Sequence, residues 1–163
     1  MDFSLKEEGV DFGALPGPVD MLLRQGVVAC QSDRLRADRL FRQALDLAPE
    51  ALPAYFCLYR VHASMGNLDA ARAAARDGLR EAARQAGWPA DPRRWPQSQS
   101  PTEGPARFAL STLQALAHIE LTRGDREAAQ ALFDILAAVD PAGRVGRPAS
   151  STSADAAVTA VWD

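Results

Sequence analysis

The feature that most restricts the fold of this chain is an internal repeat. Three segments share one pattern, in which a small residue is followed by Asp or Asn and, four residues later, by alanine. They cover residues 32–37, 66–71 and 124–129, so the second begins 34 residues after the first and the third 58 residues after the second. Asp and Asn favour tight turns and cap the free N–H groups of a following helix. The repeat therefore predicts an all-α chain of similar turn-and-helix units.

The spacing beyond each turn extends the match. Phe41 and Phe133 each lie four residues after the repeated alanine, and prolines follow at positions 49 and 141. The second unit has Ala75 and Gly78 instead, so it keeps the small residues and lacks the aromatic and the proline. Small residues let two helices approach closely, and a large aromatic fills the space beside them. This spacing predicts antiparallel helix pairs.

The 34-residue period and these spacings resemble the tetratricopeptide-repeat (TPR) superfamily over roughly residues 18–142. The first helices match more loosely, through Tyr55-x-x-Leu58 and Leu113-x-x-Leu116-Ala117, and the first unit lacks the family's leucine-glycine pair. The resemblance implies a TPR-like solenoid of three helical hairpins. One hairpin cannot cover its own apolar face, so about three have to stack to be stable.

The remaining segments flank or interrupt this predicted domain. We expect residues 1–17 to form an N-terminal arm that ends at Pro16-Gly17-Pro18 and is followed by a helix to about Cys30. Residues 143–163 are expected to be a C-terminal cap or tail. A helix start at Ser151–Asp155 and an apolar stretch ending at Trp162 favour a cap, whereas the shortness of the segment favours a tail.

Residues 84–104 form an insertion between the second and third units. Its dense proline excludes a continuous helix, and periodic sequence on both sides, over 68–86 and 105–123, predicts a tall hairpin topped by a loop. The loop carries two tryptophans and two arginines, which are residue types that often dominate binding interfaces. They are Trp88, Arg93, Arg94 and Trp95. Either these tryptophans pin the loop to its own hairpin, or they contact a partner.

The resemblance also implies where a partner would bind, because TPR domains hold peptides or helices in a concave groove lined by the first helix of each pair. Aligning the three units places nine residues in this groove. They are Leu22, Gly26 and Ala29 in the first unit, Phe56, Arg60 and Ala63 in the second, and Gln114, His118 and Leu121 in the third. The set suits an extended peptide or an amphipathic helix with an acidic residue opposite Arg60. It contains only one cation, so the carboxylate clamp of some TPR domains is not expected.

A second candidate surface is a row of arginines with a spacing of four. Arg72, Arg76, Arg80 and Arg84 share one face of the predicted helix over 68–86. The row could hold an acidic partner, or it could be a solvated face on which the interspersed Asp69, Asp77 and Glu81 neutralise it.

No motif for catalysis or metal binding is present. The chain has two histidines, His62 and His118, and two cysteines, Cys30 and Cys57, without the short fixed spacings of metal ligands. There is no phosphate-binding glycine loop and no nucleophile elbow. We therefore expect no catalytic residue, no metal and no cofactor, and we expect both cysteines to be reduced.

Charge and hydropathy narrow the possible partners. The net charge of −3 disfavours nucleic-acid binding, and no apolar run approaches the length of a membrane span. The first residues lack the basic and apolar stretches of a secretion signal, so a cytoplasmic location is expected.

The predicted function is that of a non-enzymatic adaptor or chaperone-like scaffold, monomeric or dimeric, that binds another protein. One alternative is a structural subunit that self-associates. Another follows from a resemblance of residues 78–89 and 140–146 to small bacterial TPR proteins found with nitrogen-fixation genes. That resemblance implies a helper in the assembly or protection of nitrogenase or a similar metalloenzyme.

Overall fold

The computed structural model describes residues 15–99, 101, 103–143 and 145. In this part of the chain there are six α-helices, one 3-10 turn and no strand, so the prediction of an all-α fold is confirmed for it. The helices are α1 (Gly17–Ala29), α2 (Arg34–Leu47), α3 (Leu52–Ser64), α4 (Leu68–Ala86), α5 (Gly104–Arg123) and α6 (Arg126–Val139), and the 3-10 turn η1 is Pro92–Arg94.

The repeated turn residues begin the helices as the sequence predicts, with one exception. A carboxylate oxygen of Asp33 accepts a hydrogen bond from the backbone N–H of Arg36, and Asp125 accepts one from that of Ala128. These bonds satisfy N–H groups that have no partner within the helix. Asn67 occupies the same position before α4 but makes no capping bond with its side chain.

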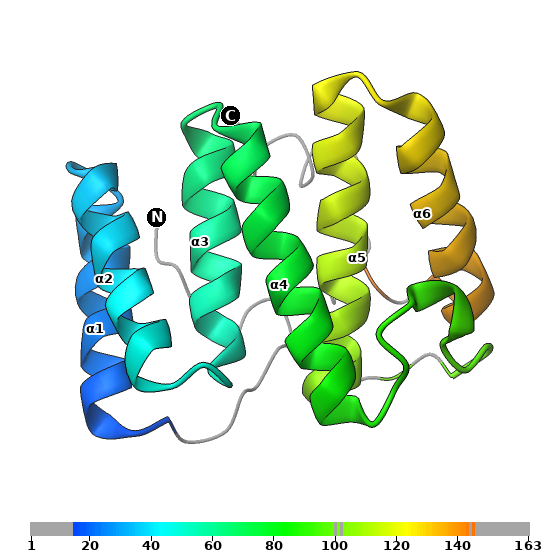
Figure 1. Ribbon diagram of the computed structural model, residues 1–163, viewed down its shortest axis with the longest axis horizontal. Helices are drawn as coiled ribbons and strands as arrows, with labels where there is room; N and C mark the ends of the chain where they lie inside the picture. The colour runs from blue at the N-terminus through cyan, green and yellow to red at the C-terminus, as the bar shows by residue number, and fades with distance from the viewer. Residues whose placement is uncertain (1–14, 100, 102, 144, 146–163) are drawn as a thin grey trace.

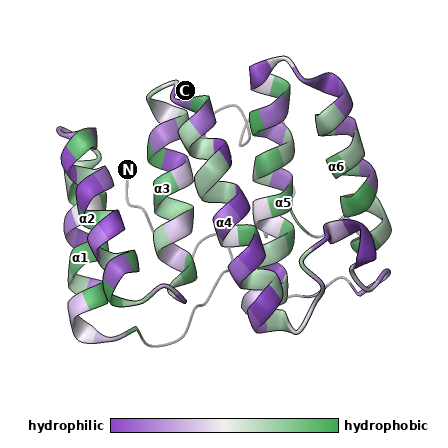
Figure 2. Cartoon of the chain, viewed as in Figure 1, coloured by the Kyte–Doolittle hydropathy of each residue, from purple (hydrophilic) through white to green (hydrophobic). Residues whose placement is uncertain are grey.

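The helices stand in a row, from α1 and α2 at one edge to α6 at the other (Figure 1). Each helix packs on the next along the chain, and α1, α3 and α5 also touch one another in that order. The central helix α3 therefore touches four other helices, and ten of its residues are buried. Figure 2 shows apolar segments along α3 and α5, as expected for helices that are covered on most sides.

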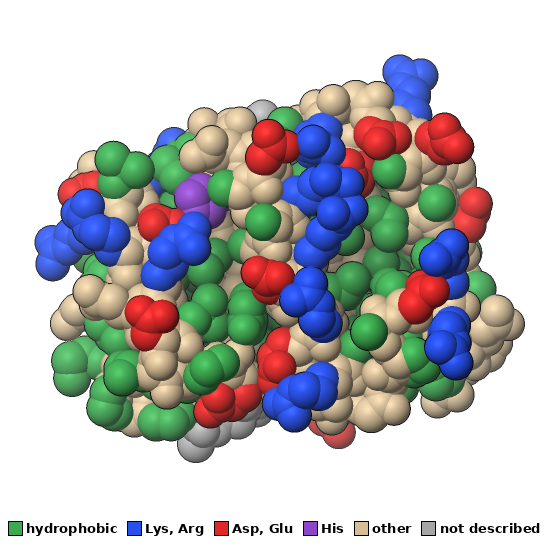
Figure 3. Space-filling model, viewed as in Figure 1, with side chains coloured by type: hydrophobic (Ala, Val, Ile, Leu, Met, Phe, Trp, Pro, Cys, Tyr) green, Lys and Arg blue, Asp and Glu red, His purple; other side chains and the backbone are tan. Residues whose placement is uncertain are grey.

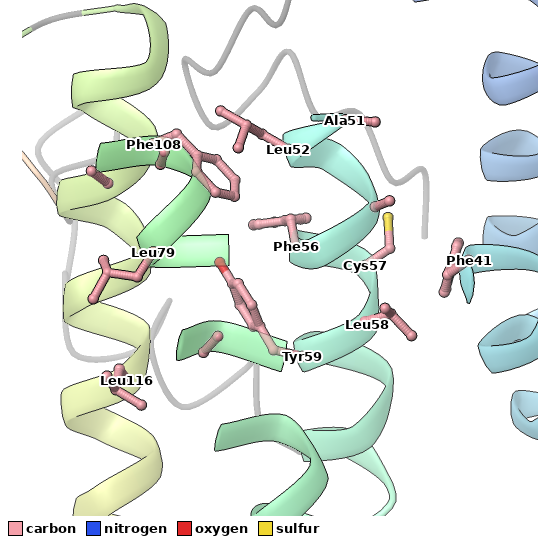
Figure 4. Packing of buried hydrophobic residues seen from close by; sticks show 14 of the residues in the cluster. Phe41, Ala51, Leu52, Phe56, Cys57, Leu58, Tyr59, Leu79, Phe108 and Leu116 are labelled. Atoms are coloured by element: carbon pink, nitrogen blue, oxygen red, sulfur yellow. The ribbon is translucent and has the colours of Figure 1, made fainter. Parts of the chain in front are cut away.

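Close packing depends on small residues at helix crossings. Ala37, Ala71 and Ala129, the repeated alanines, are all fully buried. A Cβ atom on Gly26 of α1 would lie 2.3 Å from Cε1 of Phe41 in α2, so only glycine fits there. In Figure 4, Cys57 and Leu58 point from α3 toward Phe41, while Phe56 and Tyr59 point the other way, toward Leu79 and Phe108. Apolar side chains on both sides of α3 thus join the first helices to the last ones.

Two predicted segments lie largely outside the described residues. Of the expected N-terminal arm, only residues 15–17 are described, and Gly17 already begins α1. The expected C-terminal helix at 151–162 is not described. Val145, which lies beyond α6, is buried, and its N–H donates a hydrogen bond of 2.8 Å to a carboxylate oxygen of the buried Asp140.

Candidate protein-binding surface

The nine predicted groove residues come from α1, α3 and α5, which the structure places side by side. Five of the nine take part mainly in packing. Gly26 lies against Phe41, and Ala29, Phe56 and Ala63 are buried. The ring of His118 meets the ring of Phe133 edge to face, with 5.3 Å between the ring centroids, and burial lowers the pKa of this histidine. Four of these five residues are buried, and His118 packs on α6 while remaining partly exposed.

The other four remain accessible on the same three helices. Leu22 and Gln114 are partly exposed, and Leu121 is 43% exposed. The guanidinium carbon of Arg60 lies 4.9 Å from the centroid of the Phe56 ring, so the aromatic face steadies this cation on the partly exposed side of α3. We call Leu22, Arg60, Gln114 and Leu121 the inner-face residues. Leu22 and Leu121 offer apolar surface, and Arg60 and Gln114 offer polar groups.

Polar pairs at equivalent repeat positions join the units, and sequence reasoning did not identify them. Nε2 of His62 in α3 lies 2.7 Å from Oδ1 of Asp38 in α2. Two helices later, the buried Glu120 in α5 accepts a hydrogen bond from Nε of Arg72 in α4. Positions 38 and 72 are separated by the 34-residue repeat, and positions 62 and 120 by the 58-residue interval. Because both separations equal a repeat interval, aligning the repeats could have identified these two pairs from the sequence.

The arginine row on α4 is neutralised by nearby carboxylates. Figure 3 shows it as a column of blue side chains with red ones beside it. The row pairs with residues of α4 itself and with Glu120. Its ion pairs are Arg72 and Arg76 with Glu120, Arg80 with Asp77, and Arg84 with Glu81. This pairing favours the solvated-face interpretation, because little net positive charge remains for an acidic partner.

The insertion packs onto the body of the protein. Trp95 is 3% exposed, its Nε1 donates a hydrogen bond to the carbonyl of Pro89, and its ring lies 5.1 Å from that of Trp88. The loop then crosses the end of α6, where the N–H groups of Ser98 and Gln99 donate to the carbonyls of Ala138 and Val139. These carbonyls lack partners within the helix, so the insertion caps α6. Arg93 and Arg94 remain exposed.

We expect Trp95→Ala to lower the free energy of unfolding by about 2 kcal/mol, because it removes a buried side chain from a loop that can partly collapse. Urea unfolding followed by circular dichroism measures this loss. Arg94→Ala on the same loop is the matched control and should change stability by less than about 0.5 kcal/mol. Equal stability of the two variants would show that Trp95 does not hold the loop.

The described residues offer little for redox or metal chemistry. Burial raises the pKa of Cys57 to about 12, so this thiol stays protonated at neutral pH, and burial also raises the pKa of Cys30. Cys30 and Cys57 form no disulfide in the structure. Among the described residues, no group of three His, Cys, Asp or Glu side chains is placed to hold a metal ion. None of the described helices combines the length and hydropathy needed to cross a membrane.

Comparison with known proteins adds no relative. No protein-family model, no curated protein and no solved structure matches the chain.

Proposed function

We propose that this chain is a TPR-like solenoid of three helical hairpins and that it acts as a non-enzymatic adaptor or chaperone-like scaffold. In this proposal the pairs α1–α2, α3–α4 and α5–α6 are the hairpins, and the first helix of each pair lines a groove. The packing of each helix on the next, and the contacts of α3 with α1 and α5, support it. So does the equivalence of the two polar pairs across the repeat.

The observation that carries the proposed function is that the inner-face residues stay accessible on three adjacent helices. A ligand that contacts Leu22, Arg60 and Leu121 at once would have to span three helices, which suits an elongated ligand better than a compact small molecule. The side chains offered are apolar with one cation and one amide. A peptide or amphipathic helix with an apolar stripe and an acidic residue opposite Arg60 fits this chemistry.

Enzymatic alternatives lack a suitable group in the described part of the chain. The Asp38–His62 pair has the spacing of a general base and its orienting carboxylate, but both side chains are largely buried. Their position between α2 and α3 gives them a role in packing. No residue specifically favours the nitrogenase-helper alternative over other adaptors. It therefore stays one form of the proposal, and the identity of the partner would decide it.

We expect Arg60→Glu to abolish most partner binding, because it places a carboxylate opposite the partner's acidic residue. The measurement is affinity capture from native lysate on immobilised protein, quantified by mass spectrometry for wild type and variant side by side. Proteins that bind the inner face should fall by about tenfold or more with the variant, a change that corresponds to about 1.4 kcal/mol.

The matched control is Arg39→Glu, which makes the same charge change at an exposed position of α2. It should retain the proteins that Arg60→Glu loses. If the two variants capture the same proteins in the same amounts as wild type, the inner face does not bind a partner.

A further inference from the structure

The two ends of the helix row correspond to each other in the repeat. Helices α1 and α6 belong to opposite ends of the row (Figure 1). The repeat makes α1 the counterpart of α3 and α5, and it makes α6 the counterpart of α2 and α4. Inside the row, α3 packs on α2 and α5 packs on α4. Among the described helices, α6 has no successor like α3 or α5, and α1 has no predecessor like α2 or α4.

The contacts inside the row show how two such faces fit together. Nε2 of His62 in α3 lies 2.7 Å from Oδ1 of Asp38 in α2. At the aligned positions, Glu120 in α5 binds Arg72 in α4. Arg76, one turn further along α4, also comes within 4.0 Å of Glu120. Two successive turns of α4 therefore meet the same position of the first helix that follows.

The aligned positions of α6 are open. The 58-residue interval places Gln130 at the position of Arg72 and Asp134 at that of Arg76. Gln130 and Asp134 are exposed, and Phe133 beside them is only partly buried. Nε2 of Gln130 donates a hydrogen bond of 2.9 Å to Oδ1 of Asp134, which orients the carboxylate. We call Gln130, Phe133 and Asp134 the α6 face.

The aligned position of α1 is Val28, 34 residues before His62, and it is 70% exposed. Met21 and Arg24 lie on the same side of the helix, because residues three and four positions apart are neighbours there. Met21 is 59% exposed, and the side chain of Arg24 is 80% exposed. A cavity of about 330 Å³ opens between α1 and the start of α2, lined in part by Arg24, Val28 and Arg36. We call Met21, Arg24 and Val28 the α1 face.

We propose that a second copy of this chain docks its α1 face on the α6 face of the first, so that copies stack head to tail. In the register of α4 and α5, Asp134 of one copy lies against Val28 of the next. Because the two helices run antiparallel, one turn later on α6 corresponds to one turn earlier on α1, where Arg24 lies. Its guanidinium can therefore bind the carboxylate of Asp134, while Val28 and Phe133 are withdrawn from water.

The present partner of Arg24 does not prevent this contact. Nε of Arg24 lies 2.7 Å from a carboxylate oxygen of Asp20 in the same helix. The side chain of Asp20 is 43% exposed and that of Arg24 is 80% exposed, so solvent screens the pair and holds it weakly. The guanidinium is free to turn to a carboxylate that a second copy brings.

A second copy fits the α6 face better than other occupants do. It supplies a first helix in the register that α3 and α5 already use, and it supplies both the cation and the apolar side chains. Residues 151–163 contain no Lys, Arg or His, so they cannot pair Asp134. A helix from another protein would cover the α6 face and leave Met21 and Val28 in water, whereas stacking covers both faces with one contact.

The two faces differ, so the proposed contact is heterologous. Such contacts continue to add copies until they form an open chain or a closed ring. None of the inner-face residues belongs to the α1 face or the α6 face. Arg60→Glu should therefore leave stacking unchanged, and this proposal and the proposed inner-face function can fail separately.

Sedimentation velocity of the full chain, over concentrations up to about 1 mM, measures the stacking. We expect the weight-average mass of the wild type to rise with concentration past that of a dimer. Arg24→Glu and Asp134→Arg should each weaken association by about tenfold or more, because each places two like charges opposite each other.

The double variant that carries both Arg24→Glu and Asp134→Arg exchanges the two charges. It should restore association to within about threefold of wild type. This restoration separates a lost contact from a lost fold, because a second substitution does not rescue a misfolded chain. The controls Arg39→Glu and Asp46→Arg make the same charge changes at exposed positions of α2 and should leave association unchanged.

Wild-type protein that stays monomeric over this range would overturn the proposal. Association that ignores both single substitutions, or that the double variant does not restore, would place the contact elsewhere and also overturn it. A mass that stops at that of a dimer would indicate a twofold contact instead. If association appears only after residues 1–14 or 146–163 are deleted, the chain covers one of its own faces, and the proposal fails.

Discussion

Phe41→Ala is expected to lower the free energy of unfolding by about 4 kcal/mol. The Phe41 side chain is 0% exposed and lies between α1 and α3, close enough to α1 that Gly26 has no room for a Cβ atom. Removing the ring leaves a cavity that neighbouring helices can close only in part. The loss should appear as a lower midpoint in urea unfolding with an unchanged slope.

Phe133→Ala is the matched control, because Phe133 occupies the aligned position in α6 but remains partly exposed. It should cost about half as much, since less apolar surface is withdrawn from water there. Equal losses from the two variants would mean that the α6 face is packed as closely as that of α2.

The second large effect is expected for Glu120→Ala, with a loss of about 3 kcal/mol. The Glu120 side chain is 1% exposed and binds Arg72 of α4 and Arg123 of α5. Arg123 also binds Asp69, so one buried carboxylate holds together a network that joins α4 to α5. Its removal leaves Arg72 and Arg123, whose side chains are 29% and 28% exposed, without their shared partner.

Glu81→Ala is the control for Glu120→Ala. Glu81 binds Arg84 within α4, where the side chain of Glu81 is 17% exposed and that of Arg84 is 67% exposed, so solvent screens this pair more than the Glu120 network. Thermal unfolding of both variants at the same ionic strength compares the loss of the buried Glu120 network with the loss of the Glu81–Arg84 pair. Similar melting temperatures would show that the Glu120 network adds no more than a surface pair.

The sequence alone was sufficient to predict the helices. Turn residues such as Asp33 and Asp125 act over three or four positions, so their effect can be inferred from local sequence. The apolar period predicted helices over 68–86 and 105–123, and the structure has α4 at Leu68–Ala86 and α5 at Gly104–Arg123. Proline likewise excluded a continuous helix from the insertion, because it removes an N–H donor and clashes with the preceding turn; only the short 3-10 turn η1 forms there. Each of these effects depends on neighbouring residues only.

The roles of individual side chains depended on contacts between distant segments. Aligning the repeats placed Gly26 and His118 in a groove, but the structure uses both in packing, because their partners Phe41 and Phe133 lie on neighbouring helices. The binding role of Leu22, Arg60, Gln114 and Leu121 stays a prediction.

The insertion and the polar pairs also show roles that the sequence left open and the tertiary structure decided. From the sequence, Trp95 could either contact a partner or pack on its own hairpin. In the structure it is buried beside Trp88, in a loop whose backbone is hydrogen-bonded to the end of α6. The pairs Asp38–His62 and Arg72–Glu120 join residues 24 and 48 positions apart. Periodicity determined which residues face a neighbouring helix, and the stacking of the helices decided which neighbour each of them meets.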